Sequence, residues 1–202
     1  MAEAYRGTFM LPMLMLSSIL ASANPAVLPD HLHLAAPKGS DYYGVGADAN
    51  LTAPTVMVPV TGDFVFAARV RFHFTNDYDG AALLVRADAT HWAKLLIERS
   101  KPGMEGVTSS VVRGDSDDAY HVFFGPGEDT AWLKITRKGQ RYGFYTSKDG
   151  QTWTIARDFT LSDTSSVTVG VEAQSPLGPE FSADFDHVRL ESKTATDYWQ
   201  GE

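Results

Sequence analysis

The stretch 91–100, HWAKLLIERS, carries the residues of this sequence whose types and spacing are best suited to binding a ligand. Side chains alternate between the two faces of a β-strand, so a strand here places Trp92, Lys94 and Glu98 on one face. The opposite face receives apolar residues that suit a hydrophobic core. An aromatic ring beside a cation and a carboxylate suits a sugar, because a sugar ring has apolar CH faces and a rim of hydroxyls.

Two further segments extend this polar face. A strand over 166–175, SVTVGVEAQS, places Glu172 and Gln174 opposite its core valines. A strand over 81–87, AALLVRA, places Arg86 on the side away from its core residues. Such a row is also compatible with an ordinary solvated face, on which neighbouring ions stabilise each other modestly. Spacing alone leaves both interpretations open.

The elements that must position these residues are β-strands. Helical periodicity is nearly absent, and apolar residues occupy every second position of 64–74, FVFAARVRFHF. Turn sequences such as 76-NDYDG-80 separate the candidates. The expected strands are 64–74, 81–87, 91–100, 107–113, 131–137, 141–147, 152–159, 166–175 and 181–191. Many short strands joined by tight turns predict an all-β, two-sheet antiparallel β-sandwich.

Length and composition favour one folded unit. The chain has 202 residues, of which 44% are hydrophobic, and we expect a single domain over 1–192 followed by a polar tail over 193–202. The net charge of −8 argues against nucleic acid and anionic membranes as partners. The absence of cysteine excludes disulfides and thiolate chemistry.

Motifs for cofactor or metal chemistry are missing from the sequence. It contains no phosphate-binding glycine loop, no HExxH and no GxSxG, and its six histidines are scattered. We therefore expect no cofactor, no metal and no assigned catalytic residue. Acidic clusters at Asp77/Asp79 and Asp115/Asp117/Asp118 leave calcium binding open, although such carboxylates more often cap turns.

The N-terminal segment allows two interpretations. Residues 1–23 have the outline of a secretory signal, since an apolar run over 9–20 precedes small residues at 21–23. Glu3 and Pro12 disfavour a signal. We expect instead a first strand of the fold and a cytoplasmic protein; cleavage of 1–23 would make the protein secreted.

The order of several segments resembles one family. The segments are 80-GAALLVRADATHWAKLLIE-98, 108-TSSVVRGDSDD-118, 132-WLKITRKGQRYGFYTSKDGQTW-153, 169-VGVEAQSP-176 and 183-ADFDHVRL-190. The family is a domain of unknown function in the concanavalin A-like lectin and glucanase superfamily, and its fungal branch is called regulation of enolase protein. The resemblance runs from about residue 30 to residue 190 and implies a two-sheet jelly roll with one concave face.

The same resemblance implies further site residues. The family's Trp-x-Lys-x-x-x-Glu pattern matches the strand at 91–100. Its early Thr-Asp-Phe-Trp-like element corresponds to Asp41 and Tyr43, with changed aromatics, and its Ser-Asp-Trp element to Ser116 and Asp117, where the Trp is missing. The expected ligand-binding residues are Asp41, Tyr43, Arg86, Trp92, Lys94, Glu98, Ser116, Asp117, Glu172 and Gln174.

Three functions follow as expectations. The first is a non-catalytic β-sandwich that binds a carbohydrate or similar small polar ligand in its concave groove. The second is an intracellular regulator that binds a glycolytic, enolase-type enzyme through an apolar patch near Phe123–Phe124 or Tyr198–Trp199. The third is a glycan-processing hydrolase, which needs two carboxylates about 5–9 Å apart. The Glu-x-Asp-x-Glu-like strand of the glucanases is absent, and Glu98 with Glu172 is the candidate pair.

Overall fold

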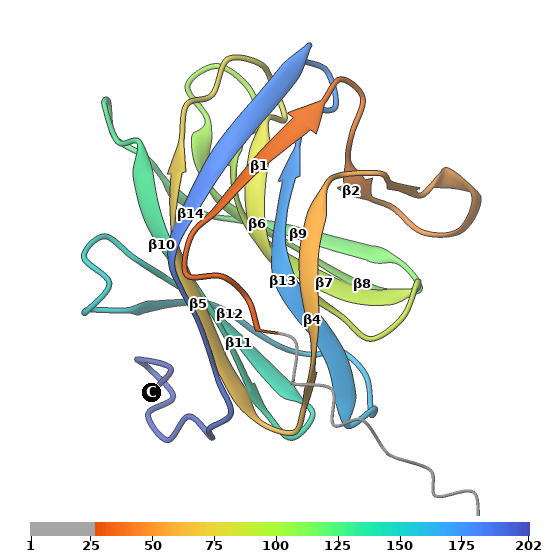
Figure 1. Ribbon diagram of the computed structural model, residues 1–202, viewed down its shortest axis with the longest axis vertical. Helices are drawn as coiled ribbons and strands as arrows, with labels where there is room; N and C mark the ends of the chain where they lie inside the picture. The colour runs from red at the N-terminus through yellow and green to blue at the C-terminus, as the bar shows by residue number, and fades with distance from the viewer. Residues whose placement is uncertain (1–26) are drawn as a thin grey trace, which may run out of the picture.

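The computed structural model describes residues 27–202, which form two antiparallel six-stranded sheets packed face to face (Figure 1). In spatial order, the first sheet contains β1 (Leu32–Pro37), β14 (Glu180–Glu191), β5 (Phe64–Phe72), β10 (Thr130–Lys138), β11 (Arg141–Ser147) and β12 (Thr154–Thr160). The second contains β4 (Thr55–Thr61), β13 (Ser166–Gln174), β6 (Gly80–Arg86), β7 (His91–Arg99), β8 (Glu105–Arg113) and β9 (Ser116–Phe123). The predicted antiparallel β-sandwich is confirmed.

The strands that alternation predicts are all present, whereas β1, β4 and β9 of the two large sheets escaped prediction. These three strands lie at sheet edges. Edge strands are short, polar or interrupted by proline, as Pro59 interrupts β4, so their alternation is weak. The expected strand over 9–20 lies outside the described residues. Within the described part of the chain, no helix has the length and hydropathy needed to cross a membrane.

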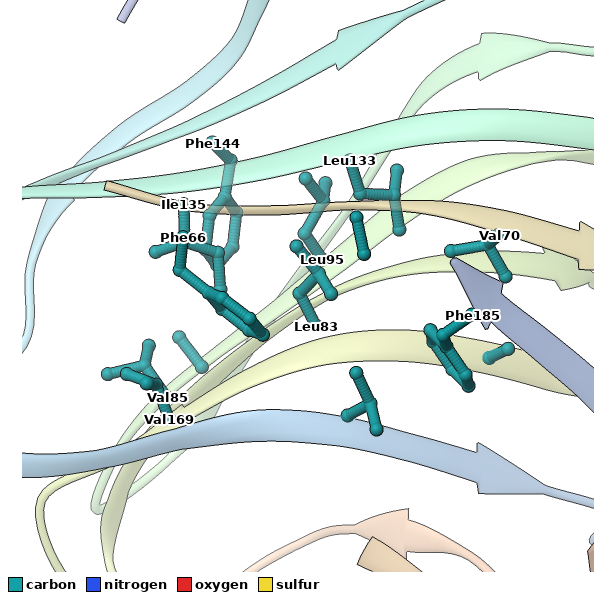
Figure 2. Packing of buried hydrophobic residues seen from close by; sticks show 14 of the residues in the cluster. Phe66, Val70, Leu83, Val85, Leu95, Leu133, Ile135, Phe144, Val169 and Phe185 are labelled. Carbon is teal, nitrogen blue, oxygen red and sulfur yellow. The ribbon is translucent and has the colours of Figure 1, made fainter. Parts of the chain in front are cut away.

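The hydrophobic core lies between the two sheets. Figure 2 shows Phe66 and Val70 of β5 facing Leu83 of β6 and Leu95 of β7, and all four side chains are fully buried. Alternation makes this packing possible, since every second residue of each strand points inward. The opposite residues of β6, β7 and β13 therefore point outward from the second sheet, which is the face that carries the predicted site.

A chain segment between β1 and β4 folds over part of this outer face. It comprises residues 40–54, here called the cover segment, and contains β2 (Tyr42–Tyr43), a 3-10 turn (Gly46–Asp48) and β3 (Asn50–Leu51). Its Tyr42 and Ala53 pack in a second buried cluster with Leu84, Trp92 and Val112 of the sheet. The cover segment thus converts one half of the outer face into a small core.

The C-terminal segment, residues 193–202, lies against the outer face of the first sheet (Figure 1). The buried Lys134 donates hydrogen bonds to the carbonyl oxygen of Gln200 at 3.0 Å and to the carboxylate of Glu202 at 3.0 Å. The Tyr145 hydroxyl donates to the carbonyl oxygen of Tyr198 at 2.8 Å. These contacts hold the polar segment against the sandwich.

We predict that Gly106→Ala destabilises the fold. Gly106 lies next to the point where the β8–β9 pairing shifts register, between Val107 and Thr108, and the backbone of β9 approaches it closely. A Cβ at position 106 would lie 2.1 Å from the carbonyl oxygen of Val122. Relieving that overlap should cost about 1–3 kcal/mol in the free energy of unfolding, measured by urea denaturation. Gly125→Ala is the control, since its Cβ would meet no heavy atom closer than 3.5 Å. Equal stability of the two variants would contradict this account.

Candidate functional site

Strand pairing aligns the outward-pointing side chains of the second sheet in rows. One row contains Gly170, Leu84, Lys94, Ser110 and Asp118. The next contains Glu172, Ala82, Leu96, Thr108 and Tyr120. The third contains Gln174, Gly80, Glu98, Gly106 and Phe123. Lys94, Glu98, Glu172 and Gln174 therefore share one face, as their alternation predicts.

These rows form the floor of a pocket of about 330 Å³. Among the expected site residues, those that line it are Asp41, Tyr43, Lys94, Glu98 and Gln174. The pocket also contains residues that sequence reasoning missed, including Tyr78, Asp118 and Tyr120 and the hydroxyl-bearing Thr108, Ser109 and Ser110. Asp118 stands where the family pattern has Trp, and Tyr120 lies two positions further along an edge strand without clear alternation.

The other expected residues lie outside the pocket, and Trp92 requires a correction. Its ring is fully buried under the cover segment, with the Tyr42 ring edge-on at a centroid distance of 4.9 Å. It packs in the second core and offers no free face to a ligand. Arg86 donates to the carbonyl oxygen of Asp88 at 3.2 Å and lines a separate hollow.

On β9, the two expected residues are held by other protein groups. The Ser116 hydroxyl donates to the Asp118 carboxylate at 3.1 Å. Asp117 forms an ion pair with Arg157 of β12, at 2.5 Å. Arg157 therefore joins the open edges of the two sheets, and neither Ser116 nor Asp117 is among the pocket residues.

Lys94 is the buried cation of the pocket floor, with 3% of its surface exposed. Its Nζ donates to Oε1 of Gln174 at 2.5 Å, and Nε2 of Gln174 donates to the carbonyl oxygen of Tyr78 at 3.1 Å. In the described part of the chain, no carboxylate lies within 4.0 Å of this Nζ. An ammonium group has three donors, so Lys94 retains hydrogen-bonding capacity beyond its bond to Gln174.

Three carboxyl groups near Lys94 have pKa values above those of ordinary carboxyl groups. Burial raises the pKa of Glu172 to about 7; Lys94 opposes this rise, and the carboxylates of Asp41 and Glu98 add to it. Burial also raises the pKa of Glu98, against a hydrogen bond of 2.7 Å from the Ser100 hydroxyl. The pKa of Asp41 is raised by burial as well.

Glu172 differs from the other two in its surroundings. It is fully buried, and among the described residues neither carboxylate oxygen has a hydrogen-bond partner. Buried polar groups are normally hydrogen-bonded, so an unpaired carboxyl is unusual. Its row places it beside Ala82 and Leu96, and Leu96 lines the pocket. Glu172 therefore lies on the same outer face as the pocket residues, although it does not itself line the pocket.

Tyr78 reaches the pocket through a strained turn. Its φ of 64° lies in the left-handed region, which a tyrosine rarely adopts. The turn is held by the buried Asp79, which accepts hydrogen bonds from the backbone N–H of Asn76 at 2.8 Å and from the hydroxyl of Ser175 at 2.9 Å. Neighbouring Asp77 pairs with Arg99 at 3.3 Å.

The acidic clusters considered for calcium are thus bonded to protein groups. Asp79 holds the turn, and at the second cluster Asp115 accepts the backbone N–H of Ser116 at 2.8 Å. Within residues 27–202, no three His, Asp or Glu side chains are grouped so that they could hold a metal ion.

The fold and the pocket together define a two-sheet jelly-roll β-sandwich domain with a polar hollow on the outer face of one sheet. Residues 23–193 match the family described as "Protein of unknown function (DUF1349)", and the chain belongs to this family. All the pocket residues fall within the matched range.

Comparisons with individual proteins agree with this assignment. Regulation of enolase protein 1 of Saccharomyces cerevisiae is 31% identical over 113 residues, which is 56% of this chain and 56% of that protein, so the match spans about half of the relative. A crystal structure of a functionally unknown protein from Saccharomyces cerevisiae superposes with a TM-score of 0.75 at 22% identity, covering 84% of this chain and 92% of the other.

Glycoside hydrolases also contain this fold. The xylan β-1,4-xylosidase from Bacillus halodurans C-125 superposes with a TM-score of 0.67 at 15% identity, covering 82% of this chain and 33% of the enzyme. At this identity the likeness shows the fold alone.

We predict that Glu172→Gln changes how stability depends on pH. Between the ordinary pKa of 4.5 and the raised value of about 7, the folded chain holds a proton that the unfolded chain has released. The free energy of unfolding therefore falls as pH rises through this window, by up to about 1.4 kcal/mol per pH unit. The variant should lose this part of the slope and retain the smaller parts from Asp41 and Glu98, whose pKa values are raised in the same direction.

The measurement is urea denaturation at several pH values between about 4.5 and 8. Glu180→Gln is the matched control, because it removes an exposed carboxylate on β14 that has no hydrogen bond or ion pair among the described residues. Parallel pH curves for Glu172→Gln and the unmodified protein would show that Glu172 titrates normally.

Proposed function

We propose that this protein is a non-catalytic β-sandwich that binds a carbohydrate or similar small polar ligand in the pocket on its second sheet. The observation that carries the proposal is the buried Lys94, whose ammonium group has one acceptor, Gln174, in the described part of the chain and faces a pocket lined by carboxyl groups. Buried polar groups with spare hydrogen-bonding capacity, placed on rigid strands, are what a polar ligand requires.

The size and lining of the pocket support this choice. Small-molecule sites usually have volumes of about 300–1,000 Å³, and 330 Å³ falls at the lower end, which suits a monosaccharide or a short oligosaccharide. The rings of Tyr43, Tyr78 and Tyr120 are available to the CH faces of a sugar. Lys94 and Glu98 offer a charged donor and a charged acceptor to its hydroxyls.

We predict that the double variant Lys94→Ala/Glu98→Ala loses ligand binding and still folds. The measurement is a thermal-shift screen of mono- and oligosaccharides, followed by calorimetry of each compound that stabilises the unmodified protein. A ligand at about ten times its dissociation constant adds roughly 1.4 kcal/mol, a shift of several degrees. The variant should bind at least about tenfold more weakly, since it loses two charged hydrogen bonds.

The control is Lys101→Ala/Glu180→Ala, which removes the same pair of charges from exposed positions away from the pocket. Unchanged affinity in the Lys94→Ala/Glu98→Ala protein would place the binding site elsewhere. Chromatography of the recovered oligosaccharides tests the hydrolase alternative in the same samples, because Asp41, Glu98 and Asp118 place several carboxyl groups around one pocket.

A second candidate function is regulation of an enolase-type enzyme in the cytoplasm through protein–protein binding. It is favoured by the 31% identity to a protein named for regulation of enolase. Both expected apolar patches carry exposed rings: Phe123 is 56% exposed and Trp199 is 68% exposed. Phe124 instead packs on Phe72 at a centroid distance of 5.1 Å, so the first patch consists of Phe123 with Tyr120.

We predict that one of the variants Phe123→Ser and Trp199→Ser weakens binding to a purified enolase by at least about tenfold, because exposed aromatic rings dominate interface energetics. Biolayer interferometry with the enolase of the same organism measures the effect. The two variants serve as controls for each other, since β9 and the C-terminal segment lie on different sheets. No binding above background by the unmodified protein would remove this candidate.

A further inference from the structure

The pocket carries an excess of negative charge. Among its described lining residues Asp41, Glu98 and Asp118 are acidic, and Lys94 is the one Lys or Arg. The carboxyl groups come from different elements: the cover segment, β7 and β9. Such convergence on one hollow disfavours a phosphorylated or otherwise anionic ligand, because like charges repel strongly at partly buried sites.

Glu172 adds an independent observation. Its fully buried carboxyl has no hydrogen-bond partner among the described residues, and it projects from the same face as Leu96 and Thr108, which line the pocket. Burial is the main cause of the raised pKa of Glu172, and the negative charges of Asp41 and Glu98 add to it. A positive charge in the pocket would relieve this mutual repulsion.

Aromatic rings on the pocket rim are also suited to a cation. Tyr43, Tyr78 and Tyr120 are 52%, 44% and 56% exposed, although each lines the pocket. The face of a tyrosine ring attracts an ammonium group through its quadrupole. The strained backbone of Tyr78, with φ of 64°, holds one of these rings at the rim.

We propose that the pocket selects hydroxylated ligands that carry an ammonium group, the amino-sugar class, over neutral sugars. The ammonium group lies between Glu98 and Asp118 and the tyrosine rings, while Lys94 and Gln174 serve the hydroxyl groups. The proposal rests on the proposed function, because it names the class of ligand for the same pocket.

The test compares sugars that differ at one substituent. Glucosamine, glucose and N-acetylglucosamine are titrated into the full-length protein by calorimetry at about pH 6, at low and at high salt. Glucosamine should bind at least about tenfold more tightly than the other two, and salt should weaken its binding most. N-acetylglucosamine separates charge from size, since it has nitrogen at the same position without the charge.

Two single substitutions locate the effect. Asp118→Asn should reduce the preference for glucosamine over glucose by at least about threefold, because it removes one carboxylate of the pocket. Glu180→Gln removes an exposed carboxylate outside the pocket and should leave the preference unchanged. Asp118 is exposed on an edge strand, so this variant is expected to fold, and its thermal unfolding is recorded to verify that.

The outcomes separate the two proposals. Equal affinity for the three sugars, or equal affinity for the two nitrogen-bearing sugars, would leave the polar-ligand function standing and overturn charge selection. A preference for glucosamine that survives Asp118→Asn as fully as Glu180→Gln would also overturn the assigned site. Binding by none of the three sugars would overturn the amino-sugar class, and the polar-ligand function would then be decided by the screen of mono- and oligosaccharides.

Discussion

Tyr42 packs edge-on against Trp92, and this contact divides the outer face of the second sheet into two halves. Where the cover segment lies on the sheet, Leu84, Trp92 and Val112 are sealed as a small core. Where it ends, the same strands continue into polar side chains that remain open to ligands. The position of the pocket is therefore set by where this apolar packing stops, and Asp41 and Tyr43, on either side of Tyr42, belong to its wall.

Burying charges beside that small core is unfavourable, so the packing of the strands must offset the lost hydration. Lys94 and Glu172 are almost or fully buried, and among residues 27–202 no ion pair within 4.0 Å restores the hydration that their charged forms lose. The sandwich core below them, with side chains such as Leu95 and Val171 fully buried, holds the backbone in place. A chain selected only for stability would be expected to carry apolar residues at these two positions, so their presence argues for a binding role.

The sequence allowed the strands and the faces to be predicted where burial is strong. In β5 and β7 every second residue enters a dry core, so the alternation is clear and the side of Lys94 and Glu98 follows from it. The edge strands β1, β4 and β9 were missed because one side of each is open and their apolar pattern is weak. Trp92 was misjudged because alternation assigns a face but does not reveal that the distant cover segment will bury part of it. Asp118 and Tyr120 escaped because β9 is an edge strand without clear alternation, and only its pairing with β8 places them opposite Ser110 and Thr108 of the pocket.

The two candidate functions meet on β9. Tyr120 lines the pocket, and Phe123 lies in the same row as Glu98, on the same outer face. A protein partner that packs on the exposed rings of β9 would therefore contact the rim of the pocket. Ligand and partner would then alter each other's affinity, and by thermodynamic linkage the two effects must be equal in size. A small polar ligand and a protein partner are thus compatible on this fold, because one strand edge contributes to both surfaces.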